Sequence, residues 1–240
     1  MKVAIKVFES NQQNGSIVGK ANVVFGDSLK VTNIAIVKNQ KNGELFVSMP
    51  SYKTEKEGQT EYHDICNPIT KKFRDDLYDG ILETYKTVRR SKDETFSETI
   101  YNVEDDSVPE FSVKVTPYHR EGSNLKGFAT VFLDDGFVIN NISILEGKNK
   151  LFVSMPSYKT NQVDPATQKP VYQEMIFPVS KVFRENLYDG ILNEYEAAKM
   201  KQQEHSTDNK EKEQADEKTQ KSEDGFNDIQ PEKAEHIFGR

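Results

Sequence analysis

The chain has 240 residues, of which 35% are hydrophobic and 30% are charged, and its formal net charge is −7 at pH 7. This length allows one or two domains, and an apolar content below that of ordinary globular chains predicts that part of the chain is not packed in a core. The negative charge excludes a polycation that coats nucleic acid by bulk electrostatics, so any such binding needs a local patch.

The single cysteine, Cys66, excludes an internal disulfide and a zinc site built from clustered thiolates, which indicates a reducing, cytoplasmic setting. The first ten residues alternate in polarity and have no unbroken apolar core, so they predict a strand rather than a signal peptide. No apolar run is long enough to span a membrane as a helix, and we expect a soluble protein.

Four strands are predicted within residues 1–90. Val3, Ile5 and Val7 alternate with less apolar residues, which is the period of a half-buried strand. Three further segments rich in β-branched and aromatic residues follow, and turn residues separate them. These segments are 20–25, 29–37 and 44–49. Their short connections predict an antiparallel meander.

After Pro68 the apolar period lengthens to that of an amphipathic helix. The predicted apolar face consists of Phe73, Leu77, Ile81, Tyr85 and Val88. Thr70 is a candidate N-cap because its side-chain oxygen can accept a hydrogen bond from the first turn, and Ser180 has the same place later in the chain. We expect the helix to cover one face of the sheet and to complete an α+β unit.

The same pattern occurs twice in the chain. LFVSMPSYKT at 45–54 recurs letter for letter at 151–160, and FRDDLYDGILETY at 73–85 returns as FRENLYDGILNEY at 183–195. This repeat predicts one domain at 1–90, a polar linker at 91–110 and a second domain at 111–200. The remainder, 201–240, is charged and lacks a strand pattern, so we expect a disordered tail, with the helix fraying near Gln203.

The LFVSMPS strand, the short segment after it and the following helix resemble the SpoVG family, whose members regulate septation, sporulation and gene expression in bacteria. The resemblance covers residues 2–90 and 112–199. It implies a four-stranded antiparallel sheet with a C-terminal helix, association as a dimer, and binding of DNA and in some cases RNA. Two copies on one chain then predict an intramolecular pseudodimer, because a linker gives the second copy a high effective concentration. Association between chains is the alternative.

The resemblance implies that nucleic acid is bound by the segment directly after MPS, with help from the helix. That segment is typically Lys-Arg-Thr in the family and is Tyr-Lys-Thr in both copies here, so each copy lacks one of two cations. Stacking of unpaired bases on the tyrosine can compensate in part. The residues expected to bind nucleic acid are Ser51, Tyr52, Lys53, Thr54, Lys71, Lys72, Arg74, Ser157, Tyr158, Lys159, Thr160, Lys181 and Arg184.

Each of these signals also has a plainer interpretation. The two SYKT segments can be polar turns at a sheet edge, and Lys71 and Lys72 can pair with Asp75 and Asp76 one turn later. A binder gathers its cations on one face, whereas a non-catalytic protein-interaction scaffold that has lost nucleic-acid binding leaves them dispersed among acids. No nucleophile motif, phosphate loop or metal-ligand spacing is present, so we expect neither an enzyme nor a bound cofactor or metal.

Overall fold

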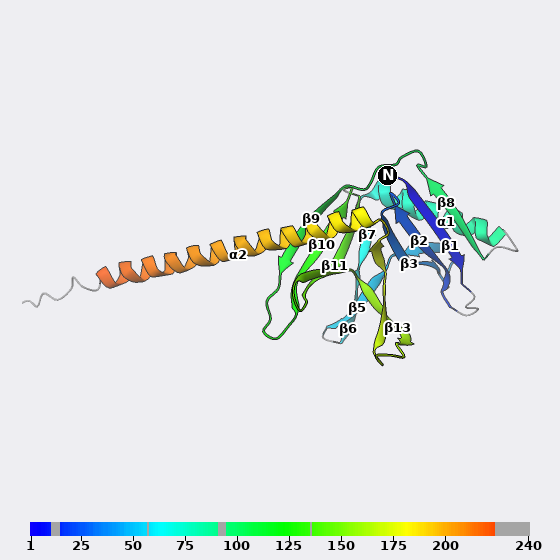
Figure 1. The fold of residues 1–240 in the computed structure, drawn as a ribbon. Helices are drawn as coiled ribbons and strands as arrows, with labels where there is room; N and C mark the ends of the chain where they lie inside the picture. The colour runs from blue at the N-terminus through cyan, green and yellow to red at the C-terminus, as the bar shows by residue number, and fades with distance from the viewer. Residues whose placement is uncertain (11–14, 57, 91–94, 135, 224–240) are drawn as a thin grey trace, which may run out of the picture. The chain divides into compact units, whose positions relative to one another are not determined.

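The structure is a computed structural model that describes residues 1–240 except 11–14, 57, 91–94, 135 and 224–240 (Figure 1). For residue 56 and residues 204–223 it describes the backbone alone. Antiparallel strands and two helices confirm the predicted α+β class. Met1–Glu196 form one unit that contains both sequence copies, and Ala197–Arg240 form a second unit.

The first copy contains the predicted four-stranded meander. Its strands, paired antiparallel in chain order, are β1 (Val3–Glu9), β2 (Ile17–Phe25), β3 (Leu29–Lys38) and β4 (Leu45–Ser48). The side chains of Ile5 and Val7, which the alternating pattern assigned to the inner face, are at most 1% exposed. Polar alternation along β1 therefore positions one apolar row in the core, as the sequence predicts.

The second copy repeats this meander, including its β-bulges. Its strands are β9 (Phe111–Pro117), β10 (Leu125–Leu133), β11 (Phe137–Glu146) and β12 (Leu151–Ser154). The strand register shifts between Ala21 and Val23 in β2 and at the matching place in β10. Beside these bulges Asn33 and Asn141 adopt positive φ angles of 61° and 59°, a conformation that asparagine tolerates better than most residues.

Helix α1 (Lys71–Arg90) packs on the first sheet, against β1 and β4. Both predicted N-caps are confirmed, since the Phe73 N–H donates to Thr70 Oγ1 at 3.3 Å and the Phe183 N–H donates to Ser180 Oγ at 3.4 Å. Helix α2 spans Lys181–Glu223, so it does not end near Gln203 as expected. The segment after Gln203 is free of glycine and proline as far as Glu223, and this composition sustains a helix. The rest of the predicted tail, 224–240, lies outside the described residues.

The two copies exchange short strands. Strand β7 (Cys66–Pro68) of the first copy pairs with β11 of the second, and β15 (Ile176–Pro178) of the second copy pairs with β3 of the first. Each exchanged strand joins its sheet at the bulge: the Thr32 N–H donates to the Met175 carbonyl and the Asn140 N–H donates to the Ile65 carbonyl, both at 2.7 Å. The predicted intramolecular pseudodimer is confirmed. Its exchanged strands were not foreseen from the sequence.

An aromatic cluster fills the core between the copies. The Phe137 ring lies 4.9 Å from the Phe25 ring and 6.4 Å from the Phe73 ring, measured between centroids. Phe137 belongs to the second copy, whereas Phe25 and Phe73 belong to the first, so neither copy completes this core alone. Cys66 lies nearby in β7 and is fully buried, and burial raises the pKa of its thiol. The thiol therefore stays protonated at neutral pH.

The predicted linker, 91–110, is more than a polar spacer. Strand β8 (Phe96–Tyr101) lies antiparallel to β1 and becomes the outermost strand of the first sheet. The Thr84 hydroxyl of α1 donates to the Thr99 hydroxyl of β8 at 2.9 Å, so the strand also covers one flank of the helix. Low hydrophobicity concealed this strand in the sequence, because an edge strand needs few apolar residues.

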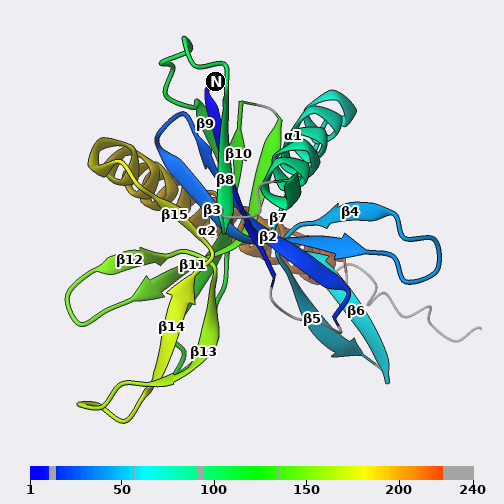
Figure 2. The same cartoon turned by 90° about the vertical axis from the view of Figure 1, so that its right-hand side faces the viewer.

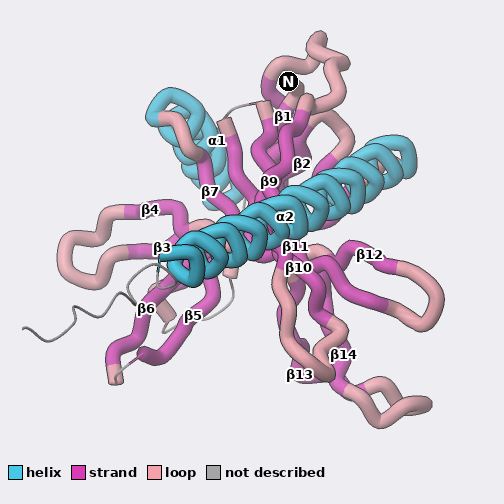
Figure 3. The backbone as a smooth tube through the Cα atoms, turned by 90° about the vertical axis from the view of Figure 1, so that its left-hand side faces the viewer, coloured by secondary structure: helices cyan, strands magenta, loops and turns pink. Residues whose placement is uncertain are grey.

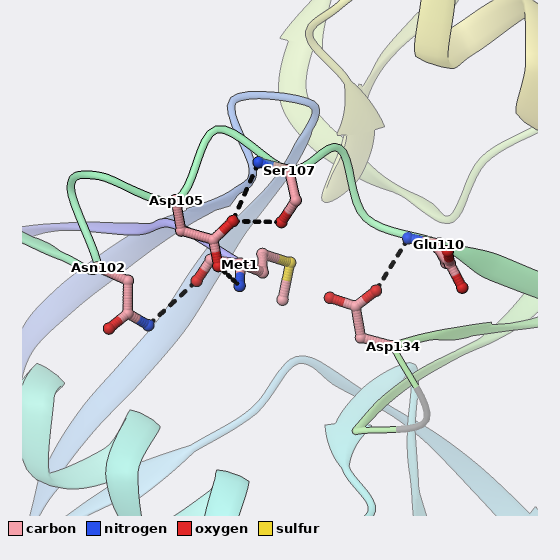
Figure 4. A network of polar contacts seen from close by, with 6 residues as sticks. All are labelled: Met1, Asn102, Asp105, Ser107, Glu110 and Asp134. Carbon is pink, nitrogen blue, oxygen red and sulfur yellow. Dashed lines mark hydrogen bonds and ion pairs between the residues drawn. The ribbon is translucent and has the colours of Figure 1, made fainter.

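Polar contacts anchor the rest of the linker between the copies (Figure 4). The Asp105 carboxylate accepts from the Met1 amino group and from Ser107, and these bonds hold the pKa of Asp105 well below its usual range. On the other side, the Glu110 N–H donates to the Asp134 carboxylate at 2.8 Å, at the turn between β10 and β11. The linker is thus bonded to the first copy through Asp105 and to the second copy through Glu110.

Candidate nucleic-acid interface

Two β-hairpins project from the Met1–Glu196 unit on the same side (Figures 2 and 3). The first pairs β5 (Ser51–Lys56) with β6 (Gln59–Asp64), and the second pairs β13 (Ser157–Val163) with β14 (Pro170–Glu174). The SYKT segments, for which polar turns at a sheet edge were the plainer interpretation, are therefore the first strands of these hairpins. Tyrosine and threonine favour extended backbone, which explains why both segments continue as strands.

Each hairpin places a lysine directly opposite a tyrosine on the neighbouring strand. Lys53 is paired with Tyr62 in the first hairpin, and Lys159 is paired with Tyr172 in the second. These tyrosines are among the most exposed aromatic side chains described, at 72% for Tyr62 and 63% for Tyr172. Sequence reasoning overlooked them, although a Tyr-x-acid pattern shortly before each exchanged strand was available as a signal.

The remaining residues of the first SYKT segment surround a histidine. The ring of Tyr52 stacks on His63 with centroids 5.2 Å apart and an interplanar angle of 27°. The Thr54 hydroxyl lies 3.0 Å from His63 Nε2, and Lys53 forms an ion pair with Glu55 at 3.4 Å. Tyr52 is still 38% exposed, so this face of the hairpin offers a flat aromatic surface to solvent.

The second SYKT segment makes different local contacts. The Tyr158 hydroxyl donates to Gln173 Oε1 at 2.8 Å, and the Thr160 hydroxyl donates to the Val171 carbonyl at 2.9 Å. A hollow of about 600 Å³ lies at the base of this hairpin, and Ser157 and Tyr172 contribute to its lining. The two hairpins therefore share the lysine and tyrosine pair but differ in the groups around it.

The first-turn cations of both helices have partners of their own. Lys71 and Lys72 form ion pairs with Asp75 and Asp76, each at 2.7 Å, and these hydrogen bonds raise the pKa of both lysines. Lys181 lies 3.7 Å from Glu185 in the same arrangement. An acid one turn away weakens the field that these lysines direct at a phosphate, which is the arrangement that the plainer interpretation expects.

The helix arginines instead lie near the hairpin bases. Arg74 donates to the Pro68 carbonyl at 3.2 Å, and Arg184 donates to the Pro178 carbonyl at 2.9 Å. Burial raises the pKa of Tyr78 while the charge of Arg74 opposes this, and Asp64, the last residue of the first hairpin, adds to the rise.

Glu174 and Arg184 act on Tyr188 in the same way in the second copy. Lys72, by contrast, lines a separate cavity with Met1 and Gly136. The expected site thus divides into the two hairpins, the arginines beside their bases, and lysines paired with acids.

In the described part of the chain, no group of three or more histidine, cysteine, aspartate or glutamate side chains is placed to hold a metal ion. No described helix combines the length and apolarity needed to cross a membrane.

Comparison with known proteins accounts for the duplicated architecture. The model of the SpoVG family matches residues 1–87 and again 109–197, the two copies that exchange strands. The chain belongs to the SpoVG family. It is 33% identical over 93 residues to the "Putative septation protein SpoVG" of Thermoanaerobacter sp. (strain X514), which covers 39% of this chain and 92% of that protein. A protein of the same name from Agathobacter rectalis is 30% identical over 83 residues, 35% of this chain and 86% of its own length. These relatives have the length of one copy, so this SpoVG chain carries two family domains where each of them carries one.

Proposed function

We propose that this protein is a non-catalytic, cytoplasmic regulator that binds nucleic acid through its two hairpins. The observation that carries the proposal is the cross-strand pair of lysine and exposed tyrosine, which recurs as Lys53 with Tyr62 and Lys159 with Tyr172. A process related to septation is suggested by the names of its SpoVG relatives.

Single-stranded DNA or RNA is the ligand that best fits these pairs. An exposed aromatic ring can stack on an unpaired base, which contributes about 1 to 3 kcal/mol per base, and an adjacent lysine can neutralise the flanking phosphate. The same ring gains little from a duplex, in which the bases are already stacked. Ser51 and Ser157 are exposed on the same strands as the lysines and add hydroxyl groups for phosphate oxygens.

The charge around each hairpin favours a modest affinity in which stacking outweighs electrostatics. The net charge of −7 and the acids beside Lys53, Lys71, Lys72 and Lys181 weaken long-range attraction to a polyanion. Both hairpins project from one side, so a single strand of nucleic acid can contact the two of them in succession. Such bivalent contact raises affinity without further cations.

A protein-interaction scaffold is the second candidate function. The acids paired with the first-turn lysines are the observation that favours it, because an acid beside each of these lysines weakens their attraction to a phosphate. In this case the projecting hairpins would present Tyr62 and Tyr172 to a protein partner, since exposed tyrosines are also common in protein interfaces.

The experiment is a titration of the full chain with labelled single-stranded DNA, single-stranded RNA and duplex DNA across a salt series. We expect single strands to bind more tightly than the duplex. The double variant Lys53→Ala/Lys159→Ala should reduce the magnitude of the negative slope of log K against log salt by about 1.4, because each phosphate contact on a single strand contributes about 0.7. The variant Tyr62→Ala/Tyr172→Ala should weaken binding at least tenfold while leaving the slope unchanged.

Matched controls separate the hairpins from the rest of the surface. Phe46 and Phe152 occupy equivalent exposed positions in β4 and β12, and Lys41 and Lys148 are exposed in the loops before these strands. Alanine at these pairs of positions should change affinity less than twofold. Absence of binding to all three nucleic acids at low salt would exclude the nucleic-acid function and leave the scaffold.

A further inference from the structure

The outer edge of β9 presents unpaired backbone groups. In the part of the chain that the structure describes, β9 pairs with β10 and with no other strand. The Asp134 N–H donates to the Glu110 carbonyl at 3.0 Å, and the Tyr118 N–H donates to the Lys126 carbonyl at 2.7 Å. These two bonds show that the even-numbered residues of the β9 strand direct their backbone groups toward β10.

The odd-numbered residues of β9 consequently direct their N–H and carbonyl groups outward, because hydrogen bonding alternates along an antiparallel pair. Val113 and Val115 therefore offer two N–H donors at the open edge. Pro117 is the last residue of the strand and also faces outward, where its missing N–H costs no bond to β10. The edge is thus suited to accept one more strand.

The apolar face of β9 is also incompletely covered. Val113 and Val115 are half-buried, whereas the equivalent residues of the first copy, Ile5 and Val7, are at most 1% exposed. The nearby glycines of the helices show the same difference, since Gly80 in α1 is buried and Gly190 in α2 is half-buried. The missing cover is the strand that β8 supplies in the first copy.

The first copy shows which kind of strand fits this edge. On β1, β8 runs antiparallel with Thr99 opposite Ile5 and Glu98 opposite Lys6. The ammonium group of Lys6 lies 3.9 Å from the centroid of the Phe96 ring, one cross-strand step away. Thr99 and Tyr101 of β8 face the helix, whereas Glu98 lies opposite Lys6 in the strand register and Phe96 contacts its ammonium group.

The equivalent of Lys6 on the open edge is Lys114, which is exposed. We propose that the outer edge of β9 binds an extended peptide segment of a partner protein, added as an antiparallel strand with an acidic residue opposite Lys114 and an aromatic residue beside it. The backbone bonds to Val113 and Val115 hold the peptide, and the lysine selects its charge. This surface is separate from the hairpins and does not depend on the proposed nucleic-acid binding.

A second copy of this chain fits the edge less well than such a peptide. Two β9 strands paired antiparallel through their outward-facing residues would bring the two Lys114 side chains opposite or diagonal to each other. Like charges at these positions destabilise a strand pair. Lysine at an exposed edge is also a common guard against pairing between identical strands. An acidic partner removes this repulsion and gains an ion pair.

The probe is a fluorescein-labelled peptide with the sequence of residues 95–103, TFSETIYNV, titrated into the full chain. We expect saturable binding of one peptide per chain, measured by fluorescence anisotropy. In the register of β8, the Thr99 N–H of the peptide faces the edge and the Ile100 N–H faces solvent. N-methylation at Thr99 should therefore weaken binding at least tenfold, whereas N-methylation at Ile100 should change it less than twofold.

Charge reversal in the protein tests which edge is used. Lys114→Glu should weaken binding of the peptide about fivefold, and a peptide carrying Glu98→Lys should restore it. Lys6→Glu is the matched control, because Lys6 lies on the edge already covered by β8, and it should leave the affinity unchanged.

Three results would overturn the proposal: no binding of the peptide, equal effects of the two N-methyl groups, or sensitivity to Lys6→Glu in place of Lys114→Glu. Self-association of the chain that Lys114→Glu abolishes would also overturn it, because a second copy would then be the occupant.

Discussion

The equivalent first strands of the two copies, β1 and β9, have different neighbours. In the first copy β1 lies between β2 and β8, and Ile5 and Val7 are at most 1% exposed. In the second copy β9 borders β10 alone among the described strands, and Val113 and Val115 remain half-buried. The inner edges, where the exchanged strands meet, stay reciprocal. Duplication has therefore preserved the surface that both copies share and allowed the outer edges to diverge.

Removing a ring from the shared core should destabilise both copies together. Phe137→Ala deletes a fully buried ring that packs against Phe25 and Phe73 of the other copy. We expect a loss of about 3 to 5 kcal/mol in the free energy of unfolding, because a large cavity remains at the interface. Urea unfolding followed by circular dichroism measures this loss.

The number of transitions matters as much as the size of the loss. The exchanged strands β7 and β15 tie each sheet to the other copy, so the two copies should unfold together in a single transition. Phe152→Ala, which removes an aromatic side chain that is 42% exposed, is the control and should cost less than about 1 kcal/mol. Two resolved transitions, with only the second copy destabilised, would contradict a shared core.

Much of this fold follows from local patterns in the sequence. Alternation in 3–7, the β-rich segments and the apolar face of the helix predict the four strands and α1, and Thr70 and Ser180 predict where the helices begin. The exchanged strands escape prediction because each has three residues and gains its neighbours from the other copy. Pairing over such a separation in sequence leaves no periodic signal. Strand β8 is similarly hidden, since its partner β1 lies at the other end of the copy.

The candidate site is likewise predictable only in part, because local letters are visible in the sequence and cross-strand neighbours are not. The repeated SYKT letters point to the hairpins, but Tyr62 and Tyr172 become visible only when the strand register places them opposite Lys53 and Lys159. Net charge alone does not reveal which cations are neutralised. The ion pair between Lys71 and Asp75 follows from helical spacing, whereas the place of the arginines beside the hairpin bases requires the tertiary structure.

A pair of smaller core truncations should measure how much stability β8 adds by covering β1, compared with the open edge of β9. Val7→Ala and Val115→Ala make the same change at equivalent positions of β1 and β9. We expect Val7→Ala to lower the free energy of unfolding by about 2 kcal/mol, because the deleted methyl groups leave a closed cavity. At Val115 the loss should be about 1 kcal/mol, since the side chain is only half-buried. Equal losses would show that β9 is as well covered as β1.

The smallest expected effect concerns the two helix glycines beside these edges. Alanine favours a helix over glycine by about 1 kcal/mol, provided that its methyl group can be accommodated. At Gly80 the new Cβ would lie 3.0 Å from Ile5 Cδ1 and 3.2 Å from Tyr101 Cε2, and Tyr101 belongs to the paired strand β8. At Gly190 it would lie 3.0 Å from Phe111 Cε2, an atom at the far end of a half-buried side chain that borders the open edge.

Gly190→Ala should therefore raise the free energy of unfolding by up to about 1 kcal/mol, while Gly80→Ala should give no gain or a loss. Thermal unfolding of the two variants at one pH and one salt concentration compares them directly. Binding of a strand to β9 should reverse the outcome at Gly190, because a Phe111 side chain that is covered on its open side yields less easily to the new methyl group. Equal gains at both glycines would mean that β8 does not restrict its edge, and the comparison between the copies would lose its physical basis.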